Sequence, residues 1–156
     1  MDTAITLSVI QEINKNLPIH SMWDGFWVHY YHKGHLTLSC SFNRIYYRDF
    51  DIDFKGVIFF NLPSEWRDTD IWGDDLIRLS DKEEFKKYHQ DFDTGNHTIM
   101  AIDIHFQKGS IHQKYTFFVV ALSVELQRVQ QSISSASSYV DIYEEEPFPC
   151  FNNRIV

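Results

Sequence analysis

Apolar and polar residues alternate with a period of two through much of this chain, and this pattern limits what the chain can fold into. A period of two is that of a β-strand with one buried face and one polar face. In residues 35–42, Leu36, Leu38 and Cys40 are apolar, whereas the residues between them are polar. The strand candidates span residues 26–31, 35–42, 46–61, 97–107 and 111–128.

Short turn signals separate neighbouring strand candidates. Lys33-Gly34 lies between the first two and Lys108-Gly109 between the last two, and tight turns of this kind join antiparallel strands. Lys55-Gly56 interrupts the third candidate and predicts a bulge. Apolar residues occupy both faces of 111–126 as far as Ala121, which predicts a central strand with a covering layer on each side.

Two segments have helical periodicity instead. Residues 3–17 place five apolar side chains within roughly 140° of a helical wheel, and Pro18 follows the last of them. Ser80-Asp81-Lys82-Glu83 is a capping box, which predicts a short helix over residues 80–89. Together these elements predict an α+β fold: a twisted antiparallel sheet of five to seven strands, with the N-terminal helix packed on one face and a second short helix.

The chain of 156 residues is expected to form a single domain over residues 1–156, because a domain of this size buries a sufficient core without metals or disulfides. Residues 130–138, QQSISSASS, have the composition of a flexible linker. Residues 139–143 alternate like an edge strand. Residues 144–156 form an acidic C-terminal segment that contains Pro147 and Pro149.

The net charge limits the class of partner. The chain has 14 basic and 22 acidic residues and a formal charge of −8, which repels nucleic acid and anionic membranes and favours a basic protein. Met1-Asp2-Thr3 lacks the basic start of a secretion signal, and Cys40 and Cys150 are expected to stay reduced. We therefore expect a cytoplasmic protein that binds another protein, with neither nucleic acid nor membrane as partner.

Most of the negative charge lies in one segment. Residues 49–75 contain eight acidic and two basic residues, a net charge of −6. Tryptophan beside exposed acids on a loop is typical of a protein interface, in which the indole anchors the partner and the acids attract it. The alternative is that the indoles cap the core and the acids are only solvated. The predicted partner-binding residues are Trp66, Asp68, Asp70, Trp72, Asp74 and Asp75.

The sequence contains none of the common catalytic motifs. Its glycines are too far apart for a dinucleotide-binding or P-loop motif, and it lacks both G-x-S-x-G and H-E-x-x-H. Asp68 and Asp70 match a calcium-binding loop, but Leu79 stands where such a loop needs a glutamate. Cys40 has apolar neighbours on its face and is expected to be buried and inert. These observations predict a protein that is not an enzyme and that binds no cofactor.

Histidines near the two hairpins provide the alternative, a metal-dependent enzyme. His29, His32 and His35 are spaced by three, but across the expected turn only His32 and His35 face each other. By the same reasoning His105 would oppose His112 in the second hairpin. Zinc takes three or four protein ligands, so we expect exposed hairpin side chains and no metal site. A structural or oligomeric domain is a third alternative.

Part of the sequence also resembles a known group of proteins. The run from Pro18 to Asp24, the Leu36-Thr37-Leu38 strand, the segment from Asp53 to Phe60 and the strand from Phe118 to Glu125 follow the layout of small bacterial proteins of unassigned function. Some of these are immunity proteins for polymorphic toxins. The chain departs from that layout where His20 and Asp24 stand four residues apart. The resemblance supplies no catalytic residue and implies a non-enzymatic inhibitor of a basic bacterial toxin.

Overall fold

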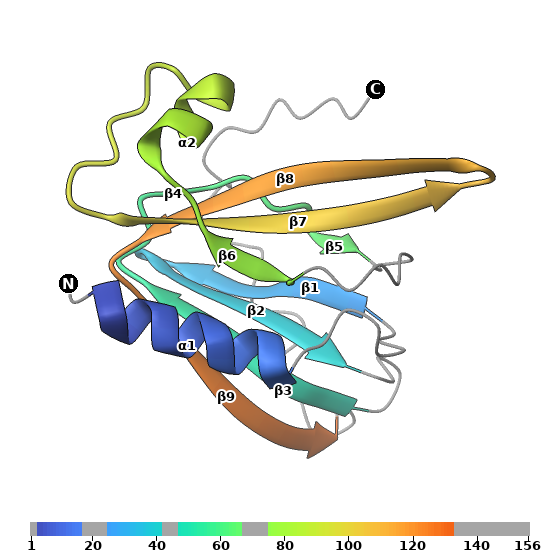
Figure 1. Cartoon of the computed structure of the whole chain (residues 1–156). Coiled ribbons are helices and arrows are strands. Elements are labelled where there is room, and N and C mark those ends of the chain that lie inside the picture. Colours follow the sequence, from blue (N-terminus) through green and yellow to red (C-terminus); the bar gives the residue numbers. More distant parts are fainter. Residues whose placement is uncertain (1–2, 17–24, 42–46, 67–74, 133–156) are drawn as a thin grey trace.

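The computed structural model describes residues 3–16, 25–41, 47–66 and 75–132 (Figure 1). These residues form helices α1 (Thr3–Asn16) and α2 (Lys82–Tyr88) and strands β1 (Gly25–His32), β2 (His35–Ser41), β3 (Tyr47–Lys55), β4 (Phe59–Phe60), β5 (Glu65–Trp66), β6 (Ile77–Leu79), β7 (Thr98–Lys108), β8 (Ile111–Ala121) and β9 (Ser123–Ser132). Neither described helix has the length and apolar character needed to cross a membrane.

The predicted α+β class, with antiparallel strands and an N-terminal helix on one face, is confirmed. The strands are divided between two antiparallel sheets, one in the order β5-β1-β2-β3-β9 and the other in the order β4-β8-β7-β6. We call them sheet A and sheet B. The division arises because two paired strands leave sheet A at the same point and continue into sheet B.

That shared corner lies at Gly56 and Leu122. Lys55 pairs with Ser123 in sheet A, Phe59 pairs with Val120 in sheet B, and the Leu122 amide donates to the Lys55 carbonyl at 2.9 Å. Gly56 has a φ of +64°, and a Cβ atom there would lie 2.6 Å from Leu122 Cδ1. Glycine therefore permits both the turn and the close approach of the two chains.

The single strand predicted over residues 111–128 is consequently two strands, β8 and β9, with the break at Leu122. Ala121 and Val124 both belong to the main core, whereas Leu122 is exposed. On a regular strand, residues that face the same side are separated by an even number of positions, whereas Ala121 and Val124 are three apart. The corner therefore shifts the alternation of buried and exposed residues by one position. β9 then pairs with β3 as far as Ser132. Strand pairing thus includes the first three residues of the predicted 130–138 linker, and the other six lie outside the described residues.

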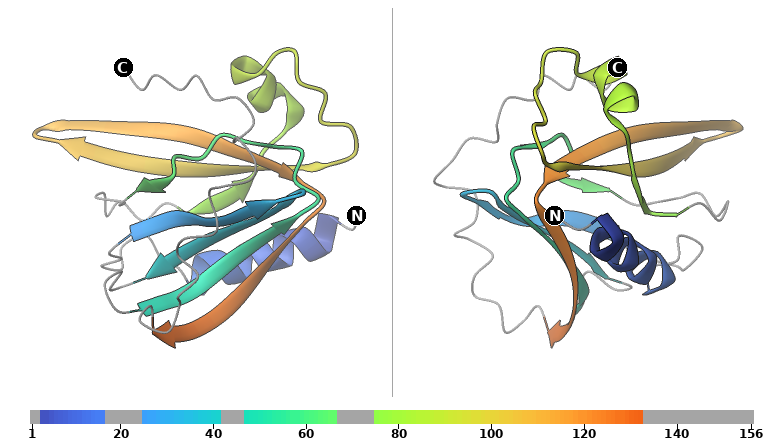
Figure 2. Two further views of the ribbon diagram at one scale, coloured as in Figure 1. Left: turned by 180° about the vertical axis from the view of Figure 1, so that it is seen from behind. Right: turned by 60° about the vertical axis from the view of Figure 1, so that its left-hand side comes forward.

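The main core lies between sheet A and a second layer made of α1 and sheet B (Figure 2). We call the sheet A surface toward this core its inner face and the opposite surface its outer face. Leu38 and Ile52 on the inner face, Ile13 of α1 and Ile102 of β7 are all fully buried in this core. The N-terminal helix packs here because its apolar side, with Ile10 and Ile13, contacts residues of both sheets in this core.

A smaller core lies on the other side of sheet B, beneath α2. Phe85 of α2 meets Phe118 of β8 edge to face at 5.3 Å, and Val120 is buried beside them. Val119 of the same strand faces the main core. The prediction that β8 is a central strand covered on both sides is therefore confirmed, since it pairs with both β4 and β7.

The second helix begins one residue later than its capping box suggested. The Asp81 side chain, rather than that of Ser80, accepts the hydrogen bond from the Glu84 amide, at 2.7 Å. The Ser80 hydroxyl donates instead to the Glu84 carboxylate at 2.6 Å. Aspartate is as good a cap as serine, and this choice leaves Ser80 free to fix the Glu84 side chain.

Candidate functional site

Three aspartates of β3 form a regular row on the outer face of sheet A. Each accepts a hydrogen bond from the hydroxyl of the residue opposite it on β2, at distances from 2.5 to 2.9 Å. We call this set the Asp–hydroxyl stripe. Its three pairs are Thr37 with Asp53, Ser39 with Asp51, and Ser41 with Asp49.

The stripe accounts for three of the eight acids in residues 49–75, and most of it is buried. Asp51 and Asp53 are each only 6% exposed, and Ser39 is fully buried. A buried carboxylate is costly unless hydrogen-bond donors satisfy it, and the hydroxyls of β2 supply one donor each. These aspartates are thus built into the sheet, unlike the freely solvated acids that attract a partner over a distance.

The first hairpin has the predicted turn. Lys33 and Gly34 both have positive φ, and His32 is directly opposite His35, as predicted. A bulge between Val28 and Tyr30 places His29 out of register with β2. His35 Nε2 lies 3.2 Å from Asp53 Oδ1, at the end of the stripe. Among the described residues no group of three or more histidines, cysteines or carboxylates could hold a metal ion.

The second hairpin corrects a prediction. Its two turn residues are Gly109 and Ser110, because Lys108 pairs with Ile111. His105 is therefore opposite Lys114, and His112 is opposite Gln107, so the predicted pairing of His105 with His112 is wrong. Glycine is favoured at the first position of such a turn, where φ is +63°, and this moves the turn one residue along the chain.

The predicted partner-binding segment is described only at its two ends. Trp66 ends β5, is 4% exposed and stacks on Phe26 with 5.3 Å between the ring centroids. Its indole is therefore part of the main core. Glu65 and Asp75, at the two ends, are exposed. The remaining predicted residues, Asp68, Asp70, Trp72 and Asp74, lie outside the described residues.

The far end of this segment is held by a residue that the sequence did not suggest. The Asn14 side chain of α1 donates to the Ile77 carbonyl at 2.8 Å and accepts from the Ile77 amide at 3.1 Å. These two bonds fix the first residue of the edge strand β6, two positions after Asp75. Asn14 lies on the polar border of a helix, where its partner 63 residues away leaves no local signal.

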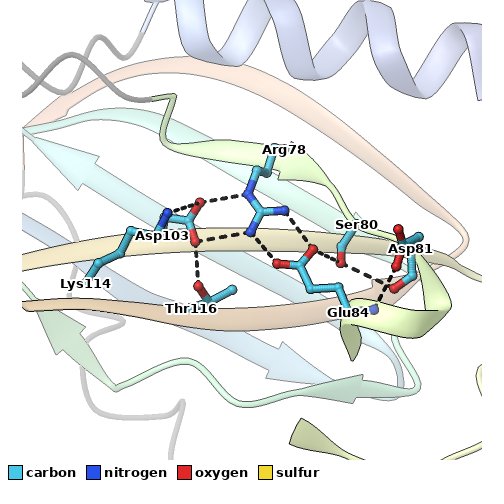
Figure 3. Close-up of polar contacts among 7 residues, drawn as sticks. All are labelled: Arg78, Ser80, Asp81, Glu84, Asp103, Lys114 and Thr116. Atoms are coloured by element: carbon cyan, nitrogen blue, oxygen red, sulfur yellow. Dashed lines mark hydrogen bonds and ion pairs between the residues drawn. The ribbon is translucent and has the colours of Figure 1, made fainter. Parts of the chain in front are cut away.

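An ion-pair network joins α2 to the face of sheet B that packs against it (Figure 3). Arg78 of β6 lies between two carboxylates. Its Nε is 2.8 Å from Asp103 Oδ2, and its two terminal nitrogens are 2.8 and 2.6 Å from the oxygens of Glu84. Thr116 donates to Asp103 at 2.7 Å, and Lys114 lies 3.9 Å from it.

The network changes the acidity of its members. The hydrogen bond from Arg78 lowers the pKa of Glu84 to about 2. Burial alone would raise the pKa of Asp103, but the hydrogen bonds from Arg78 and Thr116 outweigh it and hold that pKa below its ordinary value. Both carboxylates stay charged near neutral pH, so they act as fixed partners of Arg78 and not as proton donors.

An open pocket lies between α2 and the chain that follows it. Its volume is about 280 Å³, and Phe85, Phe92, Lys82, Lys86 and Asp91 are among its lining residues. Lys82 Nζ already donates to a carbonyl, that of Gly95, at 3.1 Å. The lining mixes charges of both signs around an aromatic base, which does not single out one class of ligand.

Cys40, the cysteine among the described residues, has an unreactive thiol. Cys40 is 1% exposed, and burial raises the pKa of its thiol well above the usual value, with smaller contributions from Asp51 and Asp49. A thiol of this kind is not a nucleophile at neutral pH.

No family model, curated protein or solved structure matches the chain.

Proposed function

We propose that this chain is a non-enzymatic acidic binding protein that acts in the bacterial cytoplasm as an immunity-type inhibitor of a basic toxin. The observation that supports it most is the attachment of the acidic segment 67–74. One of its ends follows the edge strand of sheet A and the other precedes the edge strand of sheet B. Binding residues are commonly found on segments held in this way by a rigid scaffold.

Side-chain contacts hold the residues at both ends of the 67–74 segment in place. Trp66 fixes one end through its stacking on Phe26, and the Asn14 side chain fixes the backbone of Ile77 at the other. Between these ends the chain places Asp68, Asp70 and Asp74 together with Trp72. The aspartates of β3 already accept hydrogen bonds within the stripe. The acids of residues 67–74 would therefore attract the basic partner.

The neighbouring gene gives the direct test. The protein encoded next to this chain is expressed in a bacterial host, alone and together with this chain, and growth is followed. The proposal expects growth arrest that this chain relieves, together with a stable complex of the two purified proteins. A toxic neighbour that this chain neither binds nor neutralises would contradict it.

Variants in the purified complex then locate the interface. Asp70→Asn combined with Asp74→Asn should slow association at low ionic strength, and the effect should fade at high salt. The matched control is Glu83→Gln with Asp91→Asn, which changes the net charge equally at exposed positions elsewhere and should leave the rate unchanged. Trp72→Ala should weaken binding about 30-fold through faster dissociation, as expected for an anchor residue.

A further inference from the structure

His89, the residue that follows α2, lies among aromatic rings on sheet B. The centroid of its imidazole is 4.7 Å from that of Phe59 in β4, 5.1 Å from that of Phe85 in α2 and 5.9 Å from that of Phe118 in β8. Among the described residues, its ring nitrogens have one hydrogen-bond partner: Asn61 Nδ2 lies 3.3 Å from His89 Nε2. The protonation state of His89 therefore depends on what Asn61 offers to it.

The contacts of Asn61 fix the direction of its side-chain amide. Asn61 is 7% exposed, and its backbone N–H donates to the Phe118 carbonyl at 3.2 Å. Its Oδ1 accepts from the Phe118 amide at 2.6 Å. Because a backbone N–H can only donate, the amide oxygen faces Phe118 and the NH2 group faces His89. An NH2 group also only donates, so His89 Nε2 is the acceptor and the imidazole is neutral, with its proton on Nδ1.

Protonation of His89 is incompatible with this arrangement. An imidazolium carries a proton on both nitrogens, so Nε2–H would point at the NH2 group of Asn61. Rotation of the Asn61 amide does not relieve the conflict, because it would turn the NH2 group towards the Phe118 amide. Binding of a proton at His89 and the packing of His89 against Asn61 therefore oppose each other.

Charges on the surrounding elements do not compensate for this conflict. Burial holds the pKa of His89 below its ordinary value of 6.5, with no contribution from a charged side chain of the described residues. Lys86 and Asp91 are exposed, and the exposed Tyr88 contacts Phe118. The charged groups that belong to the ion-pair network on this face of sheet B already have partners within it: Arg78, Glu84, Asp103 and Lys114.

The two ends of α2 consequently respond to different pH ranges. Arg78 holds Glu84 in the first turn, and the pKa of Glu84 is about 2, so this attachment persists in mild acid. A group whose pKa is lowered by packing binds its proton more tightly when the packing is undone, so the contact of His89 is stable above about pH 6.5 and weakens as the pH falls below that value.

We propose that His89 and Asn61 form an acid-sensitive latch, which holds the C-terminal end of α2 on β8 at neutral pH and releases it in mild acid. The first turn stays attached through Arg78, so the helix opens at one end. Release uncovers aromatic surface of the smaller core, namely Phe59 and Phe118. This inference does not depend on the proposed function, because none of these residues belongs to the acidic segment 67–74.

Hydrogen–deuterium exchange of the full-length protein at pH 7.5 and 5.5, corrected for the effect of pH on intrinsic exchange, measures the release. The reporter is residues 86–92, which include the His89 amide that donates to the Phe85 carbonyl at 3.0 Å. Their protection should fall severalfold at pH 5.5, whereas that of residues 50–54 in β3 should not change. Unchanged protection of residues 86–92 would overturn the proposal.

His89→Gln separates the latch from a general effect of acid. The glutamine oxygen can accept from Asn61 as Nε2 does, but it does not bind a proton in this pH range. Residues 86–92 should then be equally protected at both pH values. The matched control, His97→Gln, removes a histidine from the other end of the same segment and should keep the wild-type loss. An equal loss in His89→Gln and wild type would overturn the proposal.

Asn61→Asp should reverse the direction of the effect. One carboxylate oxygen can still accept from the Phe118 amide, and the other can accept from protonated His89, which a nearby negative charge favours. Residues 86–92 should then be better protected at pH 5.5 than at pH 7.5; the wild-type direction in this variant would overturn the proposal.

A wild-type titration decides the question if either variant loses the protection of residues 50–54 and so fails to fold. Nuclear magnetic resonance follows the histidine ring signals of the wild-type protein against pH. The proposal expects the His89 imidazole to titrate below pH 6.5, together with the severalfold loss of protection in residues 86–92. A midpoint at or above 6.5 would overturn it.

Discussion

Replacing Arg78 by methionine tests the network that joins α2 to sheet B. Methionine keeps most of the length of the side chain but removes five hydrogen-bond donors and the charge. The change leaves Asp103, whose side chain is 6% exposed, without its closest cationic partner. It also releases Glu84 from the same guanidinium.

The size of the expected loss in unfolding free energy depends on which partners the Asp103 carboxylate keeps in the variant. Removing one partner of a fully buried ion pair costs about 3–5 kcal/mol. Thr116 still donates to Asp103, Lys114 lies 3.9 Å away, and the Arg78 side chain is 35% exposed. We therefore expect a smaller loss, about 2–3 kcal/mol at neutral pH.

The loss should also depend on pH. Both carboxylates have folded-state pKa values below their ordinary ones, Glu84 at about 2 instead of 4.5. A carboxyl with a depressed folded pKa adds stability above its unfolded pKa, and this is lost as the pH falls through the folded pKa. The advantage of wild type over Arg78→Met should therefore shrink below about pH 4.5 and be small near pH 2.

Urea unfolding at pH 7, 5 and 3 measures this difference. Arg128→Met is the control, because Arg128 is exposed and lies over the ring of Phe50 at 5.6 Å; it should cost less than about 1 kcal/mol at every pH. A loss below about 1 kcal/mol for Arg78→Met at pH 7, or a larger loss that does not change with pH, would refute the electrostatic reasoning.

Three further predictions concern packing, backbone and metal binding. Phe118→Ala should lower the free energy of unfolding by about 3–5 kcal/mol, whereas the exposed Leu122→Ala should cost less than about 1 kcal/mol; chemical denaturation that shows equal effects would place Phe118 outside a core. Gly56→Ala should cost about 2–3 kcal/mol through strain and contact with Leu122, and Leu122→Ala in the same chain should recover part of this loss, as a double-mutant cycle would show. A chelator should leave the melting temperature of wild type, and of His32→Gln with His35→Gln, unchanged; a chelator-induced drop in wild type alone would indicate a bound metal.

Local chemistry explains why much of the secondary structure could be predicted. The Lys33-Gly34 turn, the alternation along β2 and the capping residues of α2 depend on neighbours within a few positions. The prediction failed by one residue at the second hairpin, because Gly109 is used at the first turn position instead of the second. A shift of one residue changes every cross-strand pair, and it separates His105 from His112.

The sequence by itself determined the α+β class, the alternation along β2 and β3, the two helices and the concentration of acids in residues 49–75. Only the tertiary structure decided how the strands divide, because the corner at Gly56 and Leu122 joins positions 66 residues apart. It also decided that the aspartates of β3 pair with hydroxyls, that Trp66 enters the core, and that Arg78 meets Glu84 and Asp103. Each of these depends on side chains from different elements meeting in space, and periodicity along one strand contains no information about the partner across it.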